Sequence, residues 1–84
     1  MSGIQDLIKA MVLGIVDDES AVIVAEGETD KEGTLYEITV GKDDVGKVIG
    51  KQGRVANAIR TVAKASGAKH GVRVMVNVFN KPKE

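Results

Sequence analysis

The sequence predicts a small α+β domain whose elements follow the order helix, strand, strand, helix, helix, strand. Three observations lead to this order: apolar residues recur at helical spacing near the start, three stretches have the composition or alternation of strands, and glycines divide the second half into short segments. The first two strands form an antiparallel hairpin. The second and third are joined through two helices, which requires parallel neighbours with a right-handed connection. We therefore expect one mixed sheet of three strands with three helices on one face.

The first element is a helix expected over residues 3–16. Its apolar residues share one face of a helical wheel, and polar residues lie off that face. Ser2 stands at the N-cap, with Gln5 three residues on as in a capping box. Leu13 falls opposite the main stripe and is expected at the surface. The stripe consists of Ile4, Leu7, Ile8, Met11, Val12 and Ile15.

Two strands with a long loop between them are expected next. The acidic run at 17–20 indicates a solvated turn, and the β-branched residues 21–25 indicate the first strand. Residues 26–33 are polar and bounded by glycine, so they are expected to form the hairpin loop. The second strand covers 34–40, where alternate side chains share one face. The residues on that face are Tyr36, Ile38 and Val40.

Two helices separated by a glycine turn follow. A helix of little more than one turn is expected over 45–49, and the first glycine of the turn at 50–53 ends it. A longer helix then covers 54–66, with an apolar half wider than one core contact needs. A loop at 67–71 leads to a cleanly alternating third strand at 72–79. The side chains expected to face the helices are Val72, Val74, Val76 and Val78.

Length and composition exclude several classes of protein. The 84 residues make one domain, and a chain this short buries a modest fraction of its surface. With no cysteine and one histidine, neither a disulfide framework nor a thiolate or histidine metal site is expected. No apolar run approaches the length of a membrane span, and residues 1–6 lack the basic start of a secretory signal. We expect a cytoplasmic protein without a membrane segment.

The charges are unevenly distributed, although the net charge is zero. Residues 1–40 hold two basic and nine acidic side chains, which gives a net charge of −7. Residues 41–84 hold ten basic and three acidic side chains, which gives +7. Such asymmetry indicates that one face of the protein meets a polyanion.

The turn Gly50-Lys51-Gln52-Gly53 is the segment best suited to bind an anion. Glycine lets the backbone approach a ligand closely. The N–H groups that open the next helix carry partial positive charge, and Lys51 and Arg54 add mobile positive charge at the same place. The expected anion is a phosphate of a nucleic-acid backbone.

A nucleotide-binding loop is the nearest alternative. Residues 41–47 fit Gly-x-x-x-x-Gly-Lys between a strand and a helix, but Val48 stands where magnesium needs a Ser or Thr hydroxyl. Asp43 and Asp44 also occupy the place of the phosphate oxygens. No nucleophile with a partnering base is recognisable, and the adjacent acidic residues at 17–19 do not converge on one metal. Neither an enzyme, nor a cofactor, nor a small-molecule substrate is therefore expected.

Residues 44–54 resemble the signature of the KH domain, a small RNA-binding module whose Gly-x-x-Gly loop grips the nucleic-acid backbone. They have the sequence Asp-Val-Gly-Lys-Val-Ile-Gly-Lys-Gln-Gly-Arg, and the match extends into residues 58–62. The predicted α-β-β-α-α-β order is that of the type II KH fold. Over residues 1–84 the chain is similar to the KhpA (YlqC-type) family of bacterial proteins, which consist of one KH domain and little else.

The resemblance implies a groove for single-stranded RNA between residues 45–53 with the following helix on one side and a sheet edge on the other. The turn would hold phosphates, and Asn57 and Arg60 would reach bases or sugars. Val48 and Ile49 would line the groove floor; core packing is the alternative for both residues, and it is the favoured interpretation for Ile49. Only two aromatic residues are present, which fits a groove that holds bases against aliphatic side chains. The RNA-binding residues expected are Lys47, Val48, Ile49, Gly50, Lys51, Gln52, Gly53, Arg54, Asn57 and Arg60.

The resemblance further implies an RNA chaperone or post-transcriptional regulator. It would act as a homodimer, or with a larger partner of the Jag (KhpB-type) family, in cell-wall growth and cell-length control. One KH module covers about four nucleotides, so two copies gain from effective concentration. Two alternatives remain: a protein-interaction adaptor that uses the wide apolar half of the helix at 54–66, and a ribosome-associated factor. The basic residues at the turn favour RNA over the adaptor.

Overall fold

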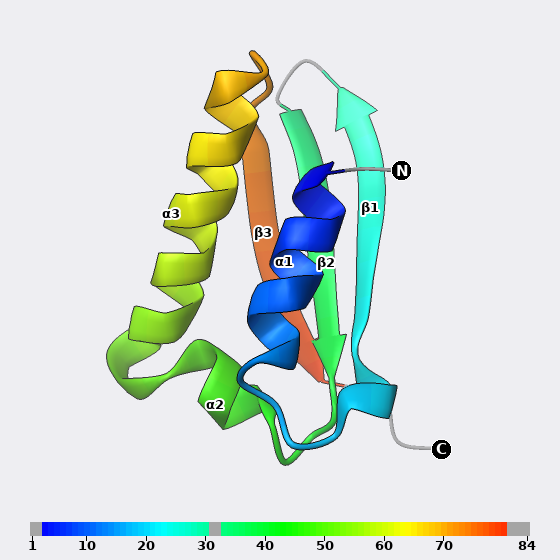
Figure 1. Ribbon diagram of the computed structural model, residues 1–84, viewed down its shortest axis with the longest axis vertical. Coiled ribbons are helices and arrows are strands. Elements are labelled where there is room, and N and C mark those ends of the chain that lie inside the picture. Colours follow the sequence, from blue (N-terminus) through cyan, green and yellow to red (C-terminus); the bar gives the residue numbers. More distant parts are fainter. Residues whose placement is uncertain (1–2, 31–32, 81–84) are drawn as a thin grey trace.

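A three-stranded sheet with helices on one face forms the protein (Figure 1). The computed structural model describes residues 3–30 and 33–80. The predicted element order and the α+β class are confirmed. The elements are α1 (Gly3–Leu13), β1 (Ile23–Asp30), β2 (Gly33–Val40), α2 (Val45–Ile49), α3 (Arg54–Lys69) and β3 (Val74–Asn80), with single 3-10 turns at Glu19–Ala21 and Lys51–Gly53.

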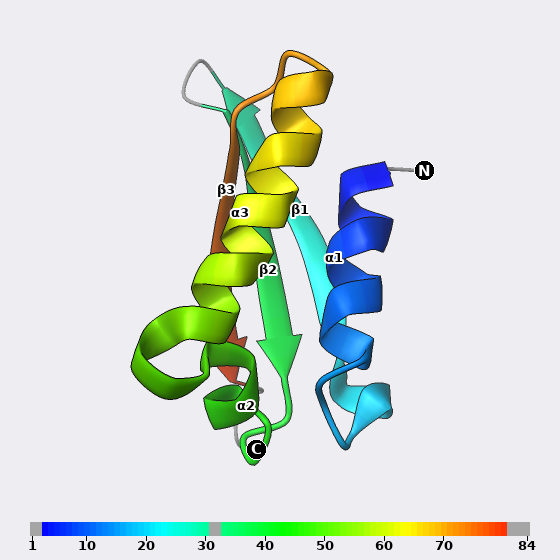
Figure 2. The same cartoon turned by 60° about the vertical axis from the view of Figure 1, so that its left-hand side comes forward.

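The sheet has the predicted mixed topology. β1 pairs antiparallel with β2, and β2 pairs parallel with β3, so β2 is central and β3 is an edge strand. Thr39 on β2 is paired with Ile23 on one side and Phe79 on the other. The connection from β2 to β3 contains α2 and α3, and in both views α3 runs beside β3 (Figures 1 and 2). This seam between α3 and β3 positions the candidate site.

The core lies between the sheet and the three helices. Residues of β2 alternate between buried and partly exposed, as the two-residue period of a strand requires. Ile38 and Val40 are in the core, as predicted. α1 contributes buried residues at every fourth position, from Ile4 to Val12. The largest fully buried side chains are Ile8, Val12, Ile38, Val40, Val48 and Val74.

Both long helices end at residues other than those predicted. α1 stops at Leu13 instead of residue 16, and Leu13 is half-buried against the core rather than on the surface. α3 continues to Lys69, because Gly67 does not begin a loop. A Cβ on Gly67 would lie 2.5 Å from Cγ2 of Val74, so glycine here lets α3 approach β3 closely. The predicted N-cap Ser2 lies outside the described residues.

The predicted hairpin loop at 26–33 is mostly strand, since β1 and β2 both continue into it. The register shifts between Glu26 and Thr29, which is typical of a β-bulge. The polar residues that suggested a loop interact across the strands. Tyr36 Oη donates to Glu26 Oε1 at 3.1 Å, and the hydroxyls of Thr29 and Thr34 lie 3.0 Å apart. Such cross-strand pairs stabilise strands whose composition alone favours a loop.

The third strand begins later than predicted. β3 starts at Val74, and Val72 is exposed instead of facing the helices. Within residues 3–30 and 33–80, no helix combines the length and apolar character that crossing a membrane requires. The same residues hold no cluster of three acidic or histidine side chains arranged to bind a metal ion.

Candidate nucleic-acid interface

The turn between α2 and α3 has an unusual backbone. Its φ angle is positive at Gly50 (77°), Gln52 (57°) and Gly53 (75°), and Gln52 is the only non-glycine residue with positive φ in the described part of the chain. The N–H of Gly50 donates to the carbonyl of Gly46 at 2.8 Å and so closes α2. The N–H of Gly53 donates back to Gly50 at 3.1 Å. The result is a tight turn on which the side chains of Lys51 and Gln52 are exposed.

Positive charge gathers where α3 begins. The N-cap residue of α3 is Gly53, which has no side chain to bond the first N–H groups of the helix. These groups carry partial positive charge. Lys51 and Arg54 are exposed beside them, and Nη2 of Arg54 lies 3.4 Å from Oε1 of Gln52. A helix start and two cations at one turn suit a phosphate.

A groove of about 310 Å³ runs from this turn along the seam between α3 and β3. Most of its lining is aliphatic or aromatic, with one arginine and one asparagine. The helical side supplies Ile49, Gly53, Ala56 and Arg60. The strand side supplies Asn77, Val78 and Phe79. This is the place in the fold where the KH groove was expected.

Arg60 crosses the seam from α3 to the sheet edge. Its Nε donates to the carbonyl oxygen of Val76 at 3.0 Å, and its Nη1 donates to Oδ1 of Asn57 at 3.1 Å. The half-buried side chain is therefore held in place from both sides. A guanidinium has five N–H donors, so these two bonds leave others for a ligand. Asn57, expected to reach bases or sugars, is exposed, accepts one of these bonds from Arg60 and is not among the residues that line the groove.

The two residues before the turn exchange their expected places. Val48, predicted to line the groove, is fully buried in the core. Ile49, for which core packing was favoured, is 38% exposed and lines the groove. Adjacent helical residues point about 100° apart, so only one of the two faces the core. A helix as short as α2 offers too few positions for its apolar pattern to show which one.

Lys47 is paired with carboxylates instead of adding charge at the turn. Its ammonium contacts the carboxylate of Asp17 and lies 3.7 Å from Oδ1 of Asp44. Asp44 is only 2% exposed, and it accepts the N–H groups of Asp17 and Asp18 at 3.1 and 3.0 Å. This network ties the turn after α1 to the start of α2. The unbalanced charge at the Gly50–Gly53 turn therefore comes from Lys51 and Arg54.

A family model for the KH domain of KhpA and KhpB matches residues 5–78, which include the turn, every groove-lining residue except Phe79, and most of the sheet. The chain belongs to the KhpA/KhpB KH-domain family. It is 40% identical over 75 residues to the RNA-binding protein KhpA of Listeria monocytogenes, covering 89% of this chain and 97% of that protein. It is 40% identical over 79 residues to the RNA-binding protein KhpA of Aquifex aeolicus, covering 94% of this chain and 99% of the relative.

A solved structure supports the fold independently. A crystal structure of an Era variant from Aquifex aeolicus, bound to GDP.AlF4-, matches with a TM-score of 0.65 and 17% identity. The match covers 93% of this chain and 30% of the Era chain. At this identity the likeness concerns the fold alone.

The residues proposed from the KH resemblance fall into three groups. Ile49, Gly53 and Arg60 line the groove; Gly50, Lys51, Gln52 and Arg54 form the turn at its end; Lys47, Val48 and Asn57 lie outside it. Sequence reasoning missed the strand side. The alternation of β3 does place Asn77 and Phe79 away from the helices, and the predicted topology makes β3 an edge strand. Together these two signals place both residues at an exposed sheet edge, but they do not show that the edge lies beside the Gly50–Gly53 turn.

We expect Asp44 to make the stability of this family member depend on pH. Hydrogen bonds from the N–H groups of Asp18 and Asp17, and the charge of Lys47, hold the pKa of Asp44 below its ordinary value of 3.8, against an opposing desolvation. Because the folded pKa is the lower one, Asp44 stabilises the fold above pH 3.8, and this contribution disappears as the pH falls through the folded pKa. Urea unfolding of the wild type and Asp44→Asn should differ most near neutral pH. A difference that stays constant down to acid pH would contradict this role.

Proposed function

We propose that this chain binds single-stranded RNA, with the Gly50–Gly53 turn on the phosphates and the α3–β3 groove on the bases. One observation carries the proposal: the turn that exposes Lys51 and Arg54 opens directly onto a groove lined by apolar side chains and Arg60. Relatives that match nearly their whole length are named RNA-binding proteins, which supports the same class of ligand.

The shape of the groove favours single strands over duplexes. Bases that lie against Ile49, Ala56 and Phe79 must be splayed out of a stack, which a paired helix does not allow. Phe79 adds an exposed aromatic ring on which a base can stack. The net charge of zero means that attraction is local to the turn and groove, so we expect modest, salt-dependent affinity.

Titration of a labelled mixed-sequence RNA strand against its own duplex tests this function. Losing one base–aromatic contact costs about 1–3 kcal/mol, so the duplex should bind roughly 5- to 150-fold more weakly than the single strand. The measurement is fluorescence anisotropy at fixed salt, with strand and duplex of equal length. Equal affinity for both would show that the groove does not read unstacked bases and would refute the proposal.

We also propose that the chain acts as a homodimer. Val62 on α3 is 43% exposed, with the exposed Ala58 and Ala65 four residues before and three residues after it. This apolar strip suits a second subunit, and pairing raises the effective concentration of two weak RNA sites. The same strip favours the alternative of an adaptor that binds another protein. Sedimentation equilibrium should give twice the mass of the chain; a monomer at all concentrations would contradict dimerisation.

The family resemblance extends the proposal to cellular roles in the cytoplasm. The chain would serve as an RNA chaperone or post-transcriptional regulator, alone or with a Jag/KhpB-type partner, in control of the cell wall and of cell length. The family model that matches covers KH domains of both KhpA and KhpB, so such a partner would contribute a related fold. We propose no enzymatic activity. Co-purification of the chain with a KhpB-type protein would support action with that partner. Its absence would support action of the chain alone.

A further inference from the structure

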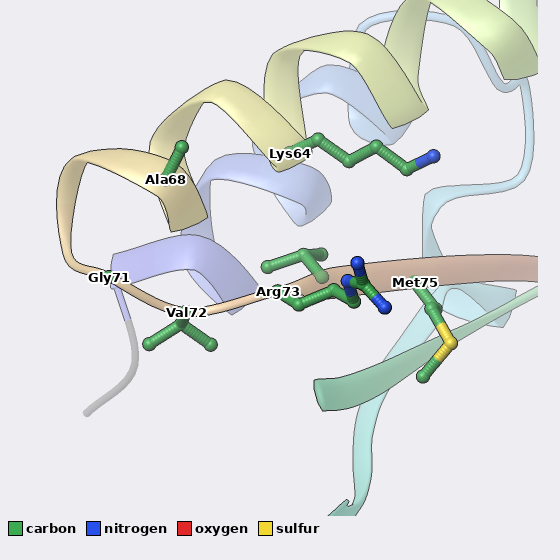
Figure 3. A pocket seen from close by; sticks show the side chains of 7 residues that line it. Lys64, Ala68, Gly71, Val72, Arg73 and Met75 are labelled. Atoms are coloured by element: carbon green, nitrogen blue, oxygen red, sulfur yellow. The ribbon is translucent and has the colours of Figure 1, made fainter. Parts of the chain in front are cut away.

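A second hollow lies on the same seam, beyond the groove described above. It has a volume of about 650 Å³ and lies between the C-terminal half of α3 and the beginning of β3 (Figure 3). Lys64 and Ala68 line it from α3, and Val72, Arg73 and Met75 line it from the strand side. None of these residues belongs to the Gly50–Gly53 turn or to the first groove.

One face of α3 connects the two hollows. Four of its residues recur at every fourth position and so form a row along the helix. The row consists of Ala56, Arg60, Lys64 and Ala68. Its first two members line the first groove and its last two line the second hollow, so the seam extends for about 18 Å at the helical rise per residue. On β3 the carbonyl of Val76, which accepts from Arg60, separates Met75 in one hollow from Asn77 in the other.

The second hollow combines two cationic side chains with a mostly apolar lining. Lys64 and Arg73 are both exposed and come from opposite walls. Figure 3 shows their charged ends extending in the same direction, toward the N-terminal half of α3. By its position in α3, Arg60 belongs to that half of the helix. Neither hollow has a carboxylate among its lining residues within the described part of the chain. Cations over apolar surface are the features by which proteins track a single nucleic-acid strand.

We infer that a single RNA strand longer than the four nucleotides held by a KH module continues from the first groove into this hollow, where Lys64 and Arg73 contact its phosphates. The inference rests on the proposed function but concerns different residues. Continuity of the seam, the sign of the charge and the apolar lining residues all fit the same ligand. The domain thus recognises a longer stretch of strand than its Gly-x-x-Gly turn alone.

Two lengths of oligouridine separate the two sites. A tetranucleotide fills the first groove only, whereas an octanucleotide reaches both. The chain and its Lys64→Gln/Arg73→Gln variant are titrated with each, and binding is followed by amide NMR shifts, which also report weak complexes. Lys9→Gln/Lys42→Gln is the matched control, since both lysines are exposed and neither lines a hollow. Circular dichroism confirms that each variant is folded.

The variant should bind the tetranucleotide as tightly as the wild type does. It should bind the octanucleotide at least about tenfold more weakly, because the loss of one hydrogen bond to a charged group lowers affinity by that factor. Its plot of log K against log salt for the octanucleotide should be shallower by about 1.4, for two phosphate contacts. Unchanged octanucleotide binding overturns the inference alone. Failure of the wild type to bind either strand overturns the proposed function as well. If the variant instead has a different sedimentation mass from the wild type, and the same dependence of affinity on RNA length, the hollow binds a protein partner. That result would also overturn the inference.

Discussion

Gly50→Ala is expected to destabilise the domain more than an alanine at either neighbouring glycine. A Cβ at this position would lie 2.4 Å from Cγ2 of Val55 and 2.8 Å from its Cβ and its backbone nitrogen. The φ and ψ angles of Gly50, +77° and 172°, also lie in a region that is essentially restricted to glycine, whereas Gly53 has left-handed helical angles. Overpacking costs about 1–3 kcal/mol and the strained backbone about as much again, so the total is about 2–6 kcal/mol. Against a stability of about 5–15 kcal/mol, this is a large share.

Two other glycines are matched controls for this substitution. Gly53 has a φ of +75°, but its Cβ would approach no atom closer than Nδ2 of Asn57 at 3.9 Å, so alanine there costs only the backbone term of about 1–2 kcal/mol. Gly46 lies in α2 with open space around it, and alanine there should raise the free energy of unfolding by at most about 1 kcal/mol. Urea unfolding followed by circular dichroism gives the order. If Gly50→Ala unfolds at the same urea concentration as Gly53→Ala, the packing of Gly50 against Val55 is wrong.

The predictions that succeeded rest on patterns with many repeats. The alternation of Tyr36, Ile38 and Val40 follows whenever a strand has one buried face. The crossover through two helices makes β2 and β3 parallel neighbours. The Gly50–Gly53 turn was found because its residues are unusual in the backbone they permit and in the charge beside them. These features depend on local chemistry, which a sequence displays directly.

The predictions that failed depend on what lies opposite each residue in space. Glycine commonly ends a helix, but Gly67 lies inside α3. Glycine is needed there because the side chain of Val74 leaves no room for a Cβ. Glu26 and Thr29 are polar as in a loop, yet their partners are on the neighbouring strand. The strand side of the groove, including Phe79, lies more than twenty residues along the chain from the turn. No periodicity connects such distant segments, and only the fold brings them together.

The largest expected effect on binding follows from Lys51→Asp combined with Gln52→Asp. Both glycines stay, both side chains are exposed, and aspartate tolerates the positive φ of Gln52, so the turn should still form. The change removes a cation and puts two carboxylates against phosphate. Like charges at an interface cost several kcal/mol, which corresponds to a loss of affinity of roughly a hundredfold or more.

A gel-shift titration on mixed cellular RNA with the wild type and this double variant tests the central claim most directly. Lys9→Asp/Ala10→Asp is the matched control, because it makes the same change of charge at exposed positions of α1. Circular dichroism establishes that all three proteins are folded. We predict that the wild type and the control shift the RNA and that the Lys51→Asp/Gln52→Asp variant does not. If the variant binds as tightly as the wild type, the turn does not hold the phosphates and RNA is bound elsewhere on the protein.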